Sequence, residues 1–342
     1  MQTRKLQEVG GGTYTVSVPK EWADDHGIEA GEEVHVYTHA DGSVVLRTAE
    51  KDGGELAATQ VEVEGDDPAP VRRAVLGAHA VGFETVTVVP AGSGAFTDDQ
   101  RRAARSVVTR LVGTDLVVER DDEIAVQHLL DASSVSVRQS VVQLQYVALS
   151  IHRRATAAFV DADTEAAERL PDRRDEAGRL ARMVGRHFAR SLVSLDEVDR
   201  LGVSRAGLFD CYVVARQLDR VAAQGVRVAR AADRLTGPLP DPVGDDVAAV
   251  AETTRTVVDD AATAVLDGGT VGAAHDALDA HDGAVADVDA VERALWDVPG
   301  AVDDPGDAVA ATRTLDALAR TADCGGAIAN VALRAAVRSE TL

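Results

Sequence analysis

The side chains that carry catalytic or metal-binding chemistry are scattered along this 342-residue sequence and share no motif spacing. Four histidines fall in segments with helical periodicity, and none has a second His or Cys at the spacing of a zinc ligand pair. They are His152, His187, His275 and His281. The sequence has no Gly-x-Ser-x-Gly elbow, no Cys-plus-His signature and no dinucleotide-binding glycine motif that opens a helix after a strand. We therefore expect core or surface histidines and no enzyme.

The chain is acidic along its whole length. It has 57 Asp and Glu against 35 Lys and Arg, a net charge of −22, and lysine occurs only at Lys5, Lys20 and Lys51. This composition resembles that of halophilic proteins of the haloarchaeal type, whose hydrated carboxylates repel their neighbours. The negative net charge excludes a generally basic protein that coats nucleic acid. Since no apolar stretch reaches the roughly 18 residues of a membrane span, we expect a cytoplasmic protein without membrane insertion.

Residues 1–50 have the pattern of a small β module. Short segments of alternating apolar and polar residues are separated by glycine turns, at residues 14–18, 34–37 and 43–47. One or two helical turns are expected from Pro19 to Gly27, with proline near the first position and glycine just past the end. A core of fewer than about fifty residues is marginal on its own, so partner contact is expected.

This module resembles the AbrB/SpoVT family of swapped-hairpin domains. The resemblance lies in Arg4-Lys5-Leu6, the turn at Gly10 to Gly12, Val16-Ser17-Val18-Pro19-Lys20-Glu21-Trp22, Gly27-Ile28, Gly31 and Val44-Val45-Leu46. It implies an obligate homodimer whose two chains interlace their strands. It also implies DNA binding through basic residues of the dimer face, here Arg4, Lys5, Lys20 and Arg47.

The charge of the module bears on DNA binding. Where DNA-binding members usually carry arginines after the Pro-x-Glu step, this sequence has Ala23, Asp24 and Asp25. Residues 1–48 hold four basic and eight acidic groups, a net charge of −4. Because phosphate contacts supply most protein–DNA affinity, we expect dimerisation in preference to strong DNA binding, and DNA contact stays an alternative.

Residues 55–131 predict a small α/β domain. Extended segments at residues 58–63, 85–89, 115–118 and 124–126 alternate with helical segments at 71–81 and 98–111. Thr97 and Gln100 have the spacing of a capping box, in which each side chain bonds the other residue's main-chain amide.

From residue 133 the sequence is helical almost throughout. Apolar residues recur at steps of four and three, as in Val137, Val141, Leu144, Ala148, Ile151, Ala155 and Ala158. Three prolines within residues 238–242 interrupt the pattern, which then starts again. We predict an α+β fold that ends in two tandem three-helix bundles, at residues 133–236 and 240–340. The third helices align at a shift of one hundred residues, for example Leu218 with Leu318 and Gly225 with Gly325.

The paired bundles resemble the two halves of PhoU-family proteins. The motifs are Leu218-Asp219-Arg220 and Leu318-Ala319-Arg320-Thr321-Ala322-Asp323. Family third helices carry two acids one turn apart, which suit a divalent metal ion. Here the residue four positions after Asp219 is Ala223, and the residue four positions before Asp323 is Ala319. Each copy therefore keeps one acid of the pair. Asp219 and Asp323 either share one ion across the pseudo-symmetric centre or are solvated or arginine-paired acids, and no cofactor is certain.

The resemblance implies a cytoplasmic, non-enzymatic regulator of phosphate uptake or phosphate homeostasis. Such a protein would bind the ATPase of a phosphate ABC transporter or a sensor kinase and restrain it. The alternative is a phosphate-responsive transcription regulator that binds DNA through residues 1–48.

Overall fold

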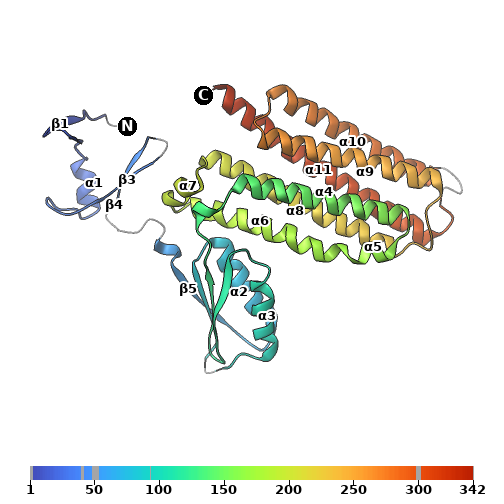
Figure 1. Ribbon diagram of the computed structural model, residues 1–342, viewed down its shortest axis with the longest axis horizontal. Coiled ribbons are helices and arrows are strands. Elements are labelled where there is room, and N and C mark those ends of the chain that lie inside the picture. Colours follow the sequence, from blue (N-terminus) through green and yellow to red (C-terminus); the bar gives the residue numbers. More distant parts are fainter. Residues whose placement is uncertain (1–2, 40–41, 48–53, 93, 298–301, 342) are drawn as a thin grey trace. The chain divides into compact units, whose positions relative to one another are not determined.

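The computed structural model describes residues 3–39, 42–47, 54–92, 94–297 and 302–341. The chain divides into two compact units, residues 1–52 and 53–342, whose elements are labelled in Figure 1. The predicted α+β class is confirmed: small β-hairpins are followed by a mixed α/β segment and then by long helices. The finer boundaries at residues 55–131, 133–236 and 240–340 stay predictions.

The N-terminal unit consists of two separate hairpins and one short helix. Its elements are β1 (Gln7–Val9), β2 (Thr13–Thr15), α1 (Lys20–Asp25), β3 (His35–Thr38) and β4 (Val44–Arg47). β1 pairs with β2 and β3 with β4, both antiparallel. Gly10 and Gly11 turn the first hairpin at φ angles of 69° and 76°, which side chains rarely adopt. The sequence pattern missed β1, and β2 ends earlier than expected because its partner has three residues.

None of the described side chains of this unit is buried. Eight apolar side chains are instead exposed, and they are Leu6, Val9, Tyr14, Val16, Val18, Val34, Val36 and Val44. A unit without a buried core cannot offset the entropy of ordering its chain. In a single copy, no described residue therefore buries these apolar side chains.

The next segment is a two-layer α/β domain. Its elements are β5 (Ala58–Val63), α2 (Pro68–Val81), β6 (Thr85–Pro90), α3 (Asp98–Val108), β7 (Thr114–Glu119) and β8 (Ile124–His128). The strand order is β5-β6-β8-β7, parallel between β5 and β6 and antiparallel elsewhere. Both helices pack on one face of the sheet (Figure 1). The predicted capping box is confirmed: the Gln100 amide donates to Thr97 Oγ1 at 3.2 Å, and the Thr97 amide donates to Gln100 Oε1 at 2.9 Å.

Long helices form the rest of the chain. They are α4 (Val137–Val160), α6 (Leu170–Ser191) and α8 (Arg205–Ala232), then α9 (Asp241–Leu266), α10 (Val271–Asp297) and α11 (Pro305–Thr341), with short α5 (Thr164–Glu168) and α7 (Leu195–Leu201) between them. α6 begins at Leu170 and is 22 residues long. Its first turns contain the charged residues 172–176, which carry no apolar stripe.

The predicted repeat has a counterpart in the packing. A Cβ atom on Gly225 of α8 would lie 2.9 Å from Ile151 Cγ2 of α4 and 3.1 Å from the main chain of His152. A Cβ atom on Gly325 of α11 would lie 2.7 Å from Val257 Cγ1 of α9. Each third helix thus approaches the first helix of its own bundle at the aligned glycine, where a larger side chain has no room.

The two bundles share their hydrophobic cores. One core cluster joins Val141 and Leu218 of the first bundle to Ile328 of the second, and another joins Phe159 to Leu318. α8 packs against α11, and α4 against α9, so these helices lie side by side in Figure 1. Within the described ranges no helix is both long and apolar enough to cross a membrane.

Candidate functional site

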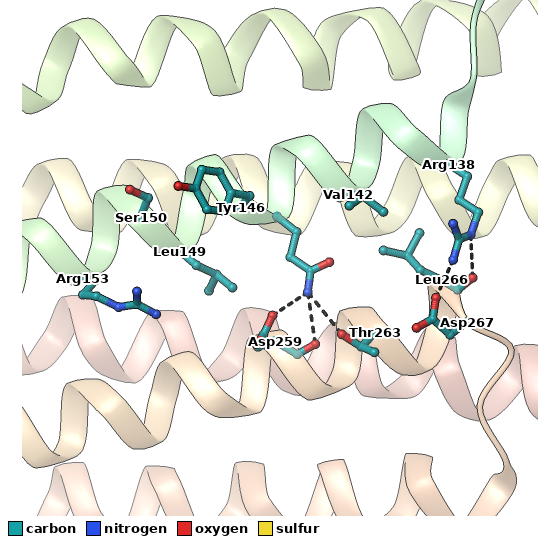
Figure 2. A pocket seen from close by; sticks show the side chains of 11 residues that line it. Arg138, Val142, Tyr146, Leu149, Ser150, Arg153, Asp259, Thr263, Leu266 and Asp267 are labelled. Atoms are coloured by element: carbon teal, nitrogen blue, oxygen red, sulfur yellow. Dashed lines mark hydrogen bonds and ion pairs between the residues drawn. The ribbon is translucent and has the colours of Figure 1, made fainter.

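A groove runs between α4 and α9, the first helices of the two bundles (Figure 2). It has a volume of about 480 Å³. Polar pairs tie its two walls together. Gln145 Nε2 of α4 donates to Asp259 Oδ1 of α9 at 2.6 Å, and Arg138 Nε donates to the Leu266 carbonyl at 2.9 Å. These groups are used to hold the bundles to each other.

Other lining groups remain open to a partner. Tyr146 is 71% exposed and Val142 is 42% exposed, in a chain with only 3% aromatic residues. Arg153 is exposed and forms no hydrogen bond or ion pair with any described residue. No histidine or cysteine is among the described residues that line the groove. A ring, an aliphatic side chain and an open cation suit binding to a protein segment.

The apolar pattern of the sequence did not indicate this groove. The stripe of α4 predicts which side of the helix faces the core, and Tyr146 lies off that stripe. A tyrosine on a face predicted to be exposed was the available signal, because large aromatic side chains are enriched at interfaces.

Asp219 lies on α8 and faces α6. Its Oδ1 atom is 2.7 Å from Arg174 Nη1, an ion pair of two side chains that are both less than a third exposed. The contact is ionic rather than a well-aligned hydrogen bond, since this oxygen has no partner of acceptable geometry. The structure thus places an arginine, the second of the two predicted alternatives, beside this carboxylate.

Asp323 lies on α11 and faces α10. Its side chain is 69% exposed, and its Oδ1 atom is 3.7 Å from His281 Nε2. His281 Nδ1 is bonded to Asp282 Oδ1 at 2.9 Å. Asp219 and Asp323 therefore have different neighbours on different helices. Across the described residues, no group of three or more His, Cys, Asp or Glu side chains is arranged to hold a metal ion, and the metal role of the two acids stays a prediction.

The predicted DNA-binding residues all lie in the N-terminal unit. Arg4 and Lys5 precede β1 and are exposed, and Lys20 is the exposed first residue of α1. The same helix carries Glu21 in its first turn. Arg47 ends β4, and its side chain lies outside the described part of the chain. Their role in binding DNA stays a prediction.

The N-terminal unit resembles MazE/AbrB-like domains. Residues 7–53 match the family described as antidote-toxin recognition MazE, bacterial antitoxin. The sequence-based recognition of a swapped-hairpin domain is thereby confirmed for this segment. No curated protein sequence matches the chain.

The helical part has the fold of PhoU. The crystal structure of the phosphate transport system regulatory protein PhoU from Streptococcus pneumoniae superposes with a TM-score of 0.51 at 14% identity, covering 58% of this chain and 92% of that one. PhoU from Pseudomonas aeruginosa gives a TM-score of 0.49 at 18% identity and covers 59% of this chain and 96% of its own. At 14% identity the first likeness shows the fold alone, and it confirms the PhoU-like bundles. Neither MazE antitoxins nor PhoU proteins are a family of enzymes.

Proposed function

We propose that this chain is a non-enzymatic regulator of phosphate uptake that acts in the cytoplasm by binding a phosphate transporter ATPase or a sensor kinase. The PhoU fold of the paired bundles carries this proposal, because the S. pneumoniae protein with that fold is a phosphate transport system regulatory protein. Regulation by contact needs a binding surface and no reaction centre.

The groove between α4 and α9 is the contact surface in this proposal. Aromatic and arginine side chains contribute most to many protein interfaces, and the groove offers Tyr146 and Arg153. The matching partner segment has an apolar side chain to pack on Tyr146 and Val142, and a carboxylate to pair with Arg153.

A pull-down from phosphate-replete and phosphate-starved cells tests the proposal. We expect the wild-type chain to retain a transporter ATPase or a sensor kinase in a phosphate-dependent manner. Tyr146→Ala combined with Arg153→Glu should lower the recovery about tenfold, the typical loss for two interface anchors. Trp296→Ala on α10 is the matched control, since this ring is 60% exposed outside the groove. If neither partner is recovered, or if the groove variant binds as well as the control, the proposal is wrong.

The N-terminal unit supports a homodimer in the same proposal. Its described residues expose eight large apolar side chains and bury none. A second copy that interlaces its hairpins with the first would cover this surface. Light scattering on the purified chain should give the mass of two copies.

DNA-dependent regulation is the second candidate, and the match to an antitoxin family favours it. It requires Arg4, Lys5 and Lys20 to contact phosphates in spite of the neighbouring acids. A gel shift with the chain's own upstream DNA at the organism's working salt should be abolished by Arg4→Ala plus Lys5→Ala. The absence of any shift with the wild-type chain argues against this candidate.

A further inference from the structure

Three arginines on one face of α6 hold the α/β domain. They are spaced four residues apart and so project from the same side of the helix. Each guanidinium donates to a main-chain carbonyl: Arg182 to Arg110 at 3.0 Å, Arg186 to His79 at 3.1 Å and Arg190 to Gly82 at 2.8 Å. The carbonyls of His79 and Gly82 are at the C-terminal end of α2, where a helix favours positive charge.

Arg186 is the central arginine, and no carboxylate of the described residues forms an ion pair with it. It is 1% exposed, and its Nε and Nη2 atoms have no hydrogen-bond partner among the described residues. The nearby carboxylates already bind Arg190, whose Nε is 2.9 Å from Glu197 Oε2 and whose Nη2 is 3.2 Å from Glu84 Oε1. Burial lowers the pKa of Arg186 to about 10, so it stays charged at neutral pH. A buried cation without a hydrogen-bonded counter-charge is costly.

Three histidines lie at this junction: the charge of Arg186 acts on two of them, and the third follows Arg186 on α6. They are His79 of α2, His128 of β8 and His187 of α6, and the Nε2 atom of each has no partner within the described ranges. The rings of His79 and His128 have centroids 6.0 Å apart. His187 Nδ1 donates to Glu197 Oε1 at 2.6 Å. Its Nε2 atom therefore carries the lone pair when the ring is neutral.

Two of these rings are neutral in the folded protein. Burial, and after it the charge of Arg186, lowers the pKa of His79 and of His128 to about 3. A neutral imidazole donates from one ring nitrogen, so each ring can present an Nε2–H group. The junction then combines one full positive charge with N–H groups of Arg186, His79 and His128 that have no hydrogen-bond partner among the described residues, next to the Nε2 acceptor of His187.

We infer that the junction between α6 and the α/β domain binds a small monovalent anion such as a halide ion. Arg186 Nε and Nη2 supply the charge-assisted bonds, and the Nε2–H groups of His79 and His128 complete the donor set. A single guanidinium beside the Glu197 carboxylate matches one negative charge better than two, which disfavours a phosphate dianion. The anion would join α6 to both α2 and β8, so binding it stabilises the docking of the α/β domain.

Thermal melting at fixed ionic strength tests this site, with gluconate replaced stepwise by chloride. The wild-type chain should show a saturable rise in melting temperature, superposed on a general salt effect that all variants share. Arg186→Met should weaken the apparent chloride affinity at least about tenfold, as expected for a lost bond to a charged group. Arg255→Met is the matched control, since Arg255 is 7% exposed and lies on α9. Equal chloride dependence in the wild type and Arg186→Met would overturn the inference.

Anomalous diffraction from bromide-soaked crystals of the wild-type chain is a second test that does not depend on a variant folding. We expect a bromide peak within hydrogen-bond distance of Arg186 Nη2 and its loss in His128→Asn crystals. Peaks confined to exposed arginines overturn the site. Calorimetry with inorganic phosphate at the same ionic strength should show no competition with bromide, and competition would overturn the monovalent assignment.

Discussion

The N-terminal unit and the helical bundles differ in what a single chain can bury. The described residues of the first unit include no buried side chain, whereas the bundles share two large clusters of fully buried residues. Burial of apolar surface is the main driving force of folding. The bundles thus bury their apolar side chains within one chain, whereas the described residues of the N-terminal unit leave theirs exposed.

Shortening a core leucine should produce the largest effect. Leu218 and Leu318 are both fully buried, one in each core cluster. Leu218→Ala and Leu318→Ala should each lower the free energy of unfolding by about 3 kcal/mol, because each leaves a cavity. Urea denaturation followed by circular dichroism measures this. Val36→Ala in the N-terminal unit is the control and should change the bundle transition by less than about 0.5 kcal/mol. Similar decreases in the free energy of unfolding for all three variants would contradict the difference in burial between the two units.

The ion pair between the bundles should give the next largest effect. Arg338 of α11 pairs with Asp210 of α8, whose side chain is 7% exposed, and burial raises the pKa of that carboxyl. Arg338→Met leaves the buried carboxylate without its partner and should lower the free energy of unfolding by about 2 kcal/mol. This loss is smaller than for a fully buried pair, because the arginine is partly exposed. Arg320→Met breaks an exposed pair with Asp316 and should cost less than about 0.5 kcal/mol. Equal costs in denaturation experiments would show that the bundles do not depend on this contact.

The pH dependence of stability should reveal the buried histidine of the bundle core through an effect that grows gradually as the pH falls. His152 is completely buried, and burial lowers its pKa from 6.5 to about 3. Below pH 6.5 the unfolded chain binds a proton that the folded chain cannot. The contribution of His152 is therefore present above pH 6.5 and is lost as the pH falls towards 3. In His152→Leu the slope of unfolding free energy against pH should decrease by about 1.4 kcal/mol per pH unit. Identical slopes between pH 6 and 4 would contradict this.

The smallest effect on bundle stability should come from the N-terminal unit. Val36→Asp with Val44→Asp places two charges on strands whose side chains are 58% and 61% exposed in one copy. We expect light scattering to show monomers while the bundle transition stays within about 0.5 kcal/mol of the wild type. Val117→Asp on β7, which is 48% exposed, is the control and should leave the mass unchanged. A dimer that survives the double variant would show that the bundles hold it together.

Sequence periodicity predicted the elements of the large unit well. It predicted the strands of the two hairpins less well. The stripe from Val137 to Ala158 is buried on α4 as expected, because spacing at three and four residues marks one face of any helix. β1 was missed because three residues are too few to show an alternating pattern. Gly225 and Gly325 align in the sequence, and only the packing shows that both mark close helix contacts.

The candidate sites were less predictable than the fold. Arg186 and His79 are 107 residues apart in sequence, and nothing local to either one indicates the other. The groove that contains Tyr146 joins α4 to α9 across the two bundles. The partners of Asp219 and Asp323 lie on α6 and α10, which the third-helix motifs do not specify.

The sequence by itself determined the helical stripes, the duplicated bundles, the capping box at Thr97 and the uneven balance between acids and bases. These features depend on residues within a few turns of one another, so spacing alone encodes them. Tertiary structure decided which arginine meets a carboxylate, which is buried without one, and how two bundles come to share two cores. Those outcomes depend on contacts between distant segments, whose positions are set only when the helices pack and exclude water.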